Sequence, residues 1–289
     1  MQEATRVFTP TPGISRGVIL VALFLFYCSA VRGQQITWIT NLDEATRIAR
    51  ETGKPVLYDF TAKWCGPCKR MDRDFWPRAD VAELAKQFVC VKVDYDVEKE
   101  MRAKYRVNAI PNVVFTDPWG RGLLGQLGFS VKTEGEIFEK IKLLPKDFTS
   151  VRDAGNTLET DQKDLNALHQ FAAFYQEKKL YWLGSEYYGR LKYLESDPTK
   201  RESILANLAF NHLRMGEPAN AIERIEELQK EYPKSQQNDL YLYGLILAHA
   251  SKNNPAKANK YLTDLKANYP RSTYIGAATE ATTNFGGTR

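Results

Sequence analysis

The chain carries the pentapeptide Trp64-Cys65-Gly66-Pro67-Cys68 between an apolar segment and a segment with helical character. Two cysteines three positions apart can close into a small disulfide or open into a dithiol. Residues 55–60 before the pair are apolar and strand-like, whereas the residues after it favour a helix. Cys65 is therefore expected where a strand ends and a helix begins. There the free N–H groups and the dipole of the helix favour a thiolate.

A cysteine pair at this spacing is also half of a common zinc site. Such a site needs a second Cys or His pair at ligand spacing. The other cysteines, Cys28 and Cys90, stand alone in apolar runs, and all three histidines lie beyond position 165. The missing second pair argues against zinc, and we predict neither a metal nor a cofactor.

The first 33 residues predict an export signal. Residues 17–27 form an uncharged apolar run, which is shorter than the ~20 residues needed to cross a bilayer as a helix. The run fits the apolar region of a secretory signal peptide, with cleavage expected after Ala30 or Gly33. An uncleaved N-terminal anchor is the alternative. The expected location is a periplasm or another exported space, where a thiol–disulfide couple has substrates.

Length and charge limit the remaining possibilities. The 289 residues are enough for two domains of roughly 100–200 residues each. The net charge is only +5, and part of the basic excess lies in the first 33 residues. Nothing in this balance indicates a nucleic-acid partner.

Residues 34–150 alternate between strand and helix patterns, which predicts an α/β domain built on a sheet. The expected strands cover residues 56–60, 88–94, 113–115 and 123–129. The expected helices cover residues 43–50, 68–75, 81–87, 98–105 and 136–144.

Residues 151–278 have helical patterns and repeat themselves. Residues 204–235 can be laid on residues 241–272 with a shift of 37, so that Tyr232-Pro233 falls on Tyr269-Pro270. The pattern resembles tetratricopeptide repeats, whose unit is 34 residues, and it predicts an all-α domain of helical hairpins of that general kind. Such a domain presents a concave surface to a partner. Residues 279–289 are expected to form a flexible tail.

Residues 55–130 resemble thioredoxin. The similarity covers roughly the whole first domain and none of the second. Besides the pentapeptide, the residues that carry it are Asp59 upstream of the cysteines, Lys92 in the following strand, the Ile110-Pro111 dipeptide, Gly120 and Gly128.

The resemblance implies a redox-active disulfide between Cys65 and Cys68. Cys65 would attack a substrate disulfide as a thiolate, and Cys68, expected to be the less exposed of the two, would then release the reduced substrate. Asp59 would accept the proton of Cys68, because a buried carboxyl has a raised pKa, and Lys92 would moderate that shift. A buried Asp59–Lys92 ion pair with no chemical role is the alternative.

The resemblance also implies a substrate-binding surface around the cysteines. Pro111 is expected to follow a cis peptide bond, which would free the backbone of Ile110 to pair with an extended substrate. A trans turn proline is the alternative. Trp64, Gly66 and Pro67 would complete this surface, although Trp64 could equally serve only in packing.

These features together predict an exported oxidoreductase that reduces or isomerises protein disulfides. Its expected partners are disulfide-containing exported proteins, a membrane electron donor, and a protein bound by the helical repeats. The Gly-Pro spacer resembles that of the reducing thioredoxins. A non-catalytic scaffold, with the first domain as a docking module, is the alternative. Copper delivery is disfavoured because Met71 is the only candidate ligand near the cysteines.

Overall fold

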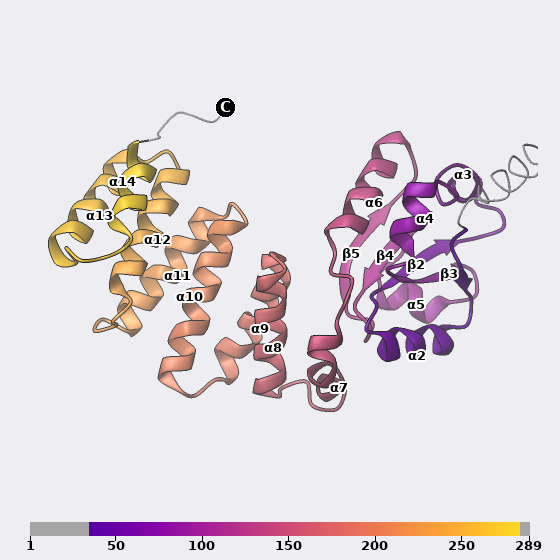
Figure 1. Ribbon diagram of the computed structural model, residues 1–289, viewed down its shortest axis with the longest axis horizontal. Helices are drawn as coiled ribbons and strands as arrows, with labels where there is room; N and C mark the ends of the chain where they lie inside the picture. Colours follow the sequence, from indigo (N-terminus) through magenta and orange to yellow (C-terminus); the bar gives the residue numbers. More distant parts are fainter. Residues whose placement is uncertain (1–34, 284–289) are drawn as a thin grey trace, which may run out of the picture.

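The computed structural model describes residues 35–283 (Figure 1). The predicted signal segment, residues 1–33, lies outside this range, as do residues 284–289. Within residues 35–283, no helix is both long and apolar enough to cross a bilayer.

The first domain is built on a five-stranded sheet with the strand order β1-β3-β2-β4-β5. The central strand β2 is parallel to β3 and antiparallel to β4, and β4 and β5 form a hairpin. The short edge strand β1 was not predicted from the sequence. The strands are β1 (Trp38–Ile39), β2 (Val56–Thr61), β3 (Val89–Asp94), β4 (Asn112–Thr116) and β5 (Gly122–Leu127).

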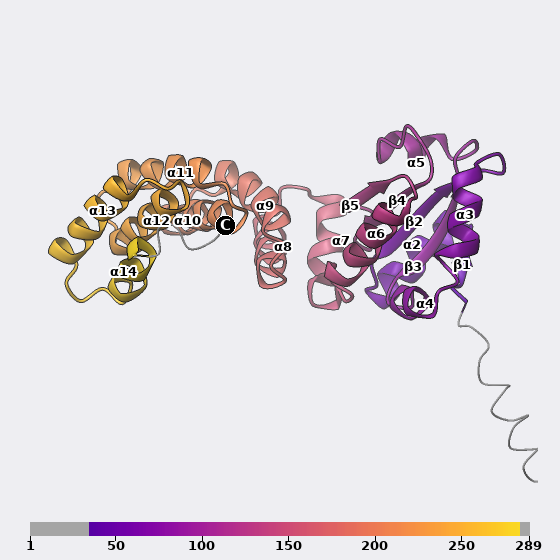
Figure 2. The same cartoon turned by 90° about the horizontal axis from the view of Figure 1, so that it is seen from above.

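Helices cover both faces of this sheet (Figure 2). Side chains of β2 alternate between the faces. Tyr58 and Phe60 pack in the core under α2 and α5, whereas Leu57 packs in the core under α3, α4 and α6. Asp59 therefore lies on the α3 side. The helices are α2 (Leu42–Thr52), α3 (Gly66–Asp74), α4 (Ala79–Ala85), α5 (Lys99–Lys104) and α6 (Val131–Leu143), of which α6 begins five residues earlier than predicted.

The second domain is a row of antiparallel helix pairs (Figure 2). A short helical segment, η1 (Thr149–Val151) and α7 (Arg152–Thr160), joins it to the first domain. Prolines occupy the first turn of α10, α11 and α13, where a missing N–H does no harm. The remaining helices are α8 (Leu165–Glu177), α9 (Tyr181–Leu194), α10 (Pro198–Arg214), α11 (Pro218–Glu231), α12 (Asn238–Ser251), α13 (Pro255–Asn268) and α14 (Ile275–Thr283).

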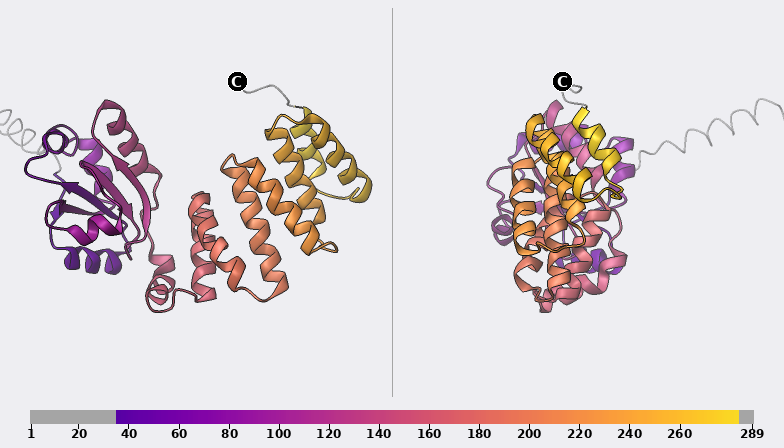
Figure 3. Two further views of the ribbon diagram at one scale, coloured as in Figure 1. Left: turned by 180° about the vertical axis from the view of Figure 1, so that it is seen from behind. Right: turned by 90° about the vertical axis from the view of Figure 1, so that its left-hand side faces the viewer.

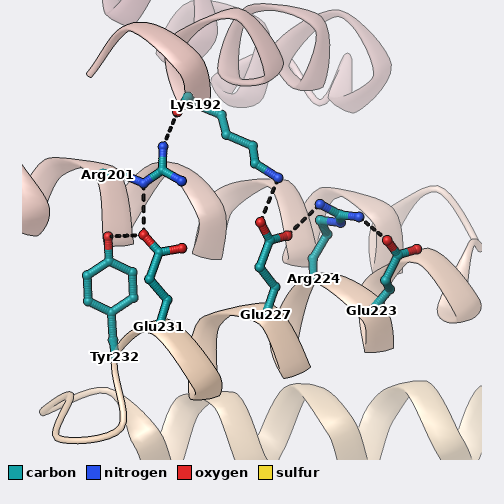
Figure 4. A network of polar contacts seen from close by, with 7 residues as sticks. All are labelled: Lys192, Arg201, Glu223, Arg224, Glu227, Glu231 and Tyr232. Atoms are coloured by element: carbon teal, nitrogen blue, oxygen red, sulfur yellow. Dashed lines mark hydrogen bonds and ion pairs between the residues drawn. The ribbon is translucent and has the colours of Figure 1, made fainter. Parts of the chain in front are cut away.

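Ion pairs join neighbouring helices of this row, and one of them joins two successive hairpins (Figure 4). Lys192 of α9 reaches Glu227 of α11 at 2.7 Å, and Arg224 binds the same carboxylate at 2.5 Å. Arg201 of α10 binds Glu231 of α11 at 2.9 Å. Because three charges share one site around Glu227, the network fixes neighbouring hairpins better than isolated surface pairs would.

The prediction of a flexible tail is wrong for residues 279–283, which belong to α14. Ala278 and Thr282 of this helix are buried, and Ala278 packs against Leu242 and Ile246 of α12. Tertiary packing thus orders a threonine-rich segment whose intrinsic helix propensity is low.

The turn between β4 and β5 inserts into the helical domain. Trp119 of this turn packs edge-on against Phe171 of α8, with ring centroids 5.8 Å apart. Its indole N–H donates to Asn156 at 2.8 Å. Gly155 makes room for the ring, because a Cβ atom at this position would lie 2.1 Å from it. The two domains consequently share one apolar core.

This interface lies at the end of the sheet opposite to the cysteines. The N–H of Phe148 donates to the carbonyl of Gly53, which precedes β2, at 2.8 Å, and Trp119 follows β4. The cysteines follow the other end of β2, whose six residues span about 20 Å. Helix α3 accordingly lies on the side of the first domain that points away from the repeats (Figures 1 and 3).

Candidate active site

The two cysteines stand at the start of α3. Cys65 is the N-cap residue of this helix, Cys68 lies in its first turn, and their sulfur atoms form a disulfide. The backbone N–H of Cys68 donates to Sγ of Cys65 at 3.1 Å. Once the disulfide opens, the same N–H and the positive end of the helix dipole stabilise a thiolate on Cys65.

Both cysteines are buried in this disulfide-bonded form. Cys65 is 2% exposed and Cys68 is 3% exposed, so the expected difference in exposure between them is absent. The reason is that one small apolar cluster, which includes Ala62 and the half-buried Ile110, covers both sulfur atoms.

Asp59 is buried beside this helix, with 2% of its surface exposed. Its Oδ2 accepts hydrogen bonds from Nζ of Lys92 at 2.5 Å and from the indole N–H of Trp76 at 2.9 Å. Its Oδ1 is buried and has no partner among the described residues. Burial raises the pKa of Asp59, while the charge and hydrogen bond of Lys92 act to lower it. A carboxyl with a raised pKa suits proton transfer near neutral pH.

Lys92 connects the buried Asp59 to the exposed Asp72. It lies directly opposite Asp59 in the parallel register of β2 and β3, and its ammonium group also binds Asp72 on α3. The ammonium lies 4.4 Å from the centre of the Trp38 ring. Burial by itself would lower the pKa of Lys92, but the two carboxylates raise it, so the side chain stays charged.

A candidate surface for an extended substrate lies next to the disulfide. The Ile110–Pro111 peptide bond is cis, the geometry expected from the sequence, and the carbonyl of Pro111 accepts from the N–H of Gly128 at 2.8 Å. Trp64 is 65% exposed, and its indole N–H donates to Asp96 at 2.9 Å. Most of the Trp64 ring is thus available for contact with another molecule.

Two residues of this site, Asp72 and Trp76, were not predicted from the sequence. Asp72 lies four residues after Cys68 in the same helix. Since residues four positions apart share one face of a helix, this spacing could have predicted that Asp72 belongs to the site. Trp76 lies beyond the end of α3 and 17 positions from Asp59. No spacing rule connects such positions, and only the folded chain brings them together.

The described part of the chain has no cluster of metal-binding side chains. Residues 35–283 contain no group of three or more His, Cys, Asp or Glu residues that could hold a metal ion.

Cys90 on β3 is a buried free thiol, and burial raises its pKa to about 12. A thiol that stays protonated in this way is unreactive.

Two family models match this chain, one in each of its two parts. A family model described as thioredoxin-like matches residues 37–118, and a tetratricopeptide repeat model matches residues 206–235 and 240–272. A thioredoxin of Mycoplasmoides gallisepticum is 38% identical over 96 residues, which are 33% of this chain and 91% of that protein. The chain belongs to the thioredoxin family. The cysteine pair and these relatives make this thioredoxin-family protein a thiol–disulfide oxidoreductase.

Other thioredoxins match the same domain. A thioredoxin H-type of Oryza sativa subsp. indica is 47% identical over 70 residues, which are 23% of this chain and 52% of that protein. The solved structure of a wild-type thioredoxin h from poplar is 25% identical and covers 37% of this chain and 94% of its own, with a TM-score of 0.32. The similarity to these thioredoxins is confined to part of this chain.

Proposed function

We propose that this thioredoxin-family protein is exported, that it reduces or isomerises protein disulfides, and that its helical domain binds a protein partner. The observation that carries the proposal is the disulfide of Cys65 and Cys68 at the start of α3, beside buried Asp59 and the cis bond before Pro111. A pure scaffold has no use for this set of groups, whereas disulfide exchange uses each of them.

The proposed cycle begins with the Cys65 thiolate, which attacks one sulfur of a client disulfide. A Cys65–client disulfide forms, and the second client sulfur leaves as a thiolate that takes up a proton. Cys68 then loses its proton to Asp59, and the Cys68 thiolate attacks Sγ of Cys65. The Cys65–Cys68 bond forms, the first client sulfur leaves with the electron pair, and the client has gained two electrons.

Two observations support the direction and the location. The Gly66-Pro67 spacer resembles that of reducing thioredoxins, whose potential of about −270 mV favours reduction of most client disulfides. The apolar run at residues 17–27 supports export. In an oxidising compartment the disulfide must regain two electrons from outside, and we propose a membrane reductase as their source.

One relative supports disulfide exchange between proteins. It is the thiol:disulfide interchange protein DsbD of Ralstonia nicotianae, which is 32% identical over 91 residues. These residues are 15% of that protein, so the similarity is limited to a small part of it.

We place the partner site in a groove of about 660 Å³ between α10 and α12. Half-buried apolar side chains line it, among them Phe210, Tyr243 and Leu247, and Arg214 is its only charged lining residue. This lining favours a partner segment with apolar side chains and an acidic group. The groove is remote from the cysteines, so a bound partner leaves the disulfide open to a client.

Insulin reduction by dithiothreitol tests the catalytic part of the proposal. We expect the wild-type protein to accelerate it and Cys65→Ser to abolish the acceleration. A wild-type protein without cysteine-dependent acceleration would promote the scaffold alternative, in which the first domain only docks. A redox potential above about −150 mV, close to the −120 mV of a strong oxidant, would reverse the proposed electron direction.

A further inference from the structure

Trp76 holds the carboxylate of Asp59 from a fixed position. The residue is 3% exposed, and its ring packs edge-on against the ring of Trp38, with centroids 5.1 Å apart, and at a tilt against the ring of Phe75, with centroids 4.9 Å apart. Its backbone N–H donates to the carbonyl of Met71 at 3.1 Å, which ties it to the last turn of α3. Because ring and backbone are both held, the indole N–H has one direction in which to donate.

Both donors to Asp59 meet the same oxygen. The indole of Trp76 and the ammonium of Lys92 bind Oδ2, and Oδ1 is left buried without a partner in residues 35–283. A half-turn of the carboxylate only exchanges two equivalent oxygens, so at any time one oxygen meets both donors and the other is free. An oxygen that accepts no hydrogen bond from the described residues is free to take up a proton, which is the task that the proposed cycle gives to Asp59.

We infer that Trp76 is a positioning residue for disulfide exchange: together with Lys92 it immobilises one oxygen of Asp59, so that the other oxygen accepts the proton of Cys68. The inference rests on the proposed function, in which Asp59 takes this proton. Trp76 itself touches neither client nor sulfur in the proposed cycle.

Trp76 differs from the other groups around Asp59 because it donates without bringing a charge. The titratable groups that face Asp59 are Lys92 and Cys90 on β3 and Asp72 on α3. On β4 the register partner is the apolar Val113. The hydrogen bond from Trp76 lowers the pKa of Asp59 against the larger, opposite effect of burial. Loss of the indole N–H should therefore raise this pKa and hold the plane of the carboxylate less firmly.

Trp76→Phe removes the N–H and keeps an aromatic ring in the core. Trp119→Phe is the matched control, since Trp119 is also a buried indole whose N–H meets one oxygen acceptor, at the opposite end of the sheet. The first measurement is the NMR titration of the Asp59 side-chain carboxyl in the oxidised full-length protein, assigned with Asp59→Asn. The second is the rate at which Cys68 resolves a preformed mixed disulfide, measured against pH.

We expect Trp76→Phe to move the Asp59 titration to higher pH and to slow resolution about tenfold, as for one lost hydrogen bond to a charged group. The acid limb of the rate profile should move to higher pH, and Trp119→Phe should change neither quantity. In an Asp59→Asn background, Trp76→Phe should cause no further loss of rate.

An unchanged Asp59 titration in Trp76→Phe would overturn the inference. So would an equal slowing by Trp76→Phe with and without Asp59, because the effect would then come from packing. If the wild-type protein fails to reduce insulin, the proposed function fails, while the titration in the oxidised protein still tests the contact between Trp76 and Asp59.

Discussion

Lys92 lies 2.5 Å from Oδ2 of Asp59 and at the same time binds the exposed carboxylate of Asp72. The ammonium group of Lys92 therefore binds one carboxylate inside the protein and another at its surface. Because Lys92 divides its charge between the two, it does not cancel the effect of burial, and the pKa of Asp59 stays raised. This sharing explains how the site can hold a basic carboxylate next to a lysine.

The raised pKa of Asp59 predicts a stability that depends on pH. A group whose folded pKa lies above its unfolded pKa stabilises the fold at pH values below the unfolded pKa, and this contribution disappears as the pH rises through the folded pKa. Asp59→Asn should therefore increase the free energy of unfolding at pH 7 by roughly 1–3 kcal/mol. Lys92 keeps Asp72 as its partner in this variant.

Urea unfolding at pH 7 and pH 4 measures this effect, and the gain should shrink at the lower pH. A variant that is less stable than the wild type at pH 7 would show that the charged pair stabilises the fold.

Asp72→Asn should shift the pH dependence of client reduction to lower pH. The negative charge of Asp72 raises the pKa of Asp59, so its removal lowers this pKa and leaves Lys92 to Asp59 alone. Asp74→Asn is the control, because Asp74 lies on the same helix and pairs with Arg73 instead. The measurement is the rate of insulin reduction between pH 4 and 8. If the pH dependence shifted equally in Asp72→Asn and Asp74→Asn, the shift would come from the net charge of α3 and not from the contact between Asp72 and Lys92.

Cys68→Ser should trap clients on Cys65. Without the resolving thiol, the mixed disulfide between Cys65 and a client has no internal exit, and non-reducing electrophoresis should show cross-linked species that dithiothreitol removes. Cys90→Ser should trap nothing and keep full activity, because Cys90 is buried and its pKa is raised to about 12. If the double variant Cys65→Ser/Cys68→Ser still formed cross-links with clients, the attacking thiol would not be Cys65.

Gly155→Ala should destabilise the contact between the two domains. The added Cβ would lie 2.1 Å from the ring of Trp119, and overpacking of this kind costs roughly 1–3 kcal/mol. Gly189→Ala in α9 is the matched control, since its Cβ meets nothing within 4 Å and alanine favours a helix by roughly 0.5–1 kcal/mol. Thermal unfolding should show a lower midpoint for the first variant and an unchanged or higher one for the second. Equal midpoints would mean that the Trp119 ring moves aside freely.

Much of the first domain could be predicted from local patterns. The strand before the cysteines, the helix after them and the pairing of Asp59 with Lys92 follow from residue spacing and from the resemblance to thioredoxin. The helical tail and β1 were missed, because a threonine-rich segment and a two-residue strand carry too little intrinsic preference. Packing against distant helices and pairing with β3 decide these elements.

Local patterns were enough to put Cys65 and Cys68 at a strand-to-helix junction and to predict a helical repeat domain after them, because both depend on periodicity within a few dozen residues. The contact of Trp76 with Asp59, the binding of Lys92 by Asp72, and the packing of Trp119 between the far end of the sheet and the repeats are visible only in the folded chain. These contacts join positions with no common period. Burial and directional hydrogen bonds select them once the chain has folded.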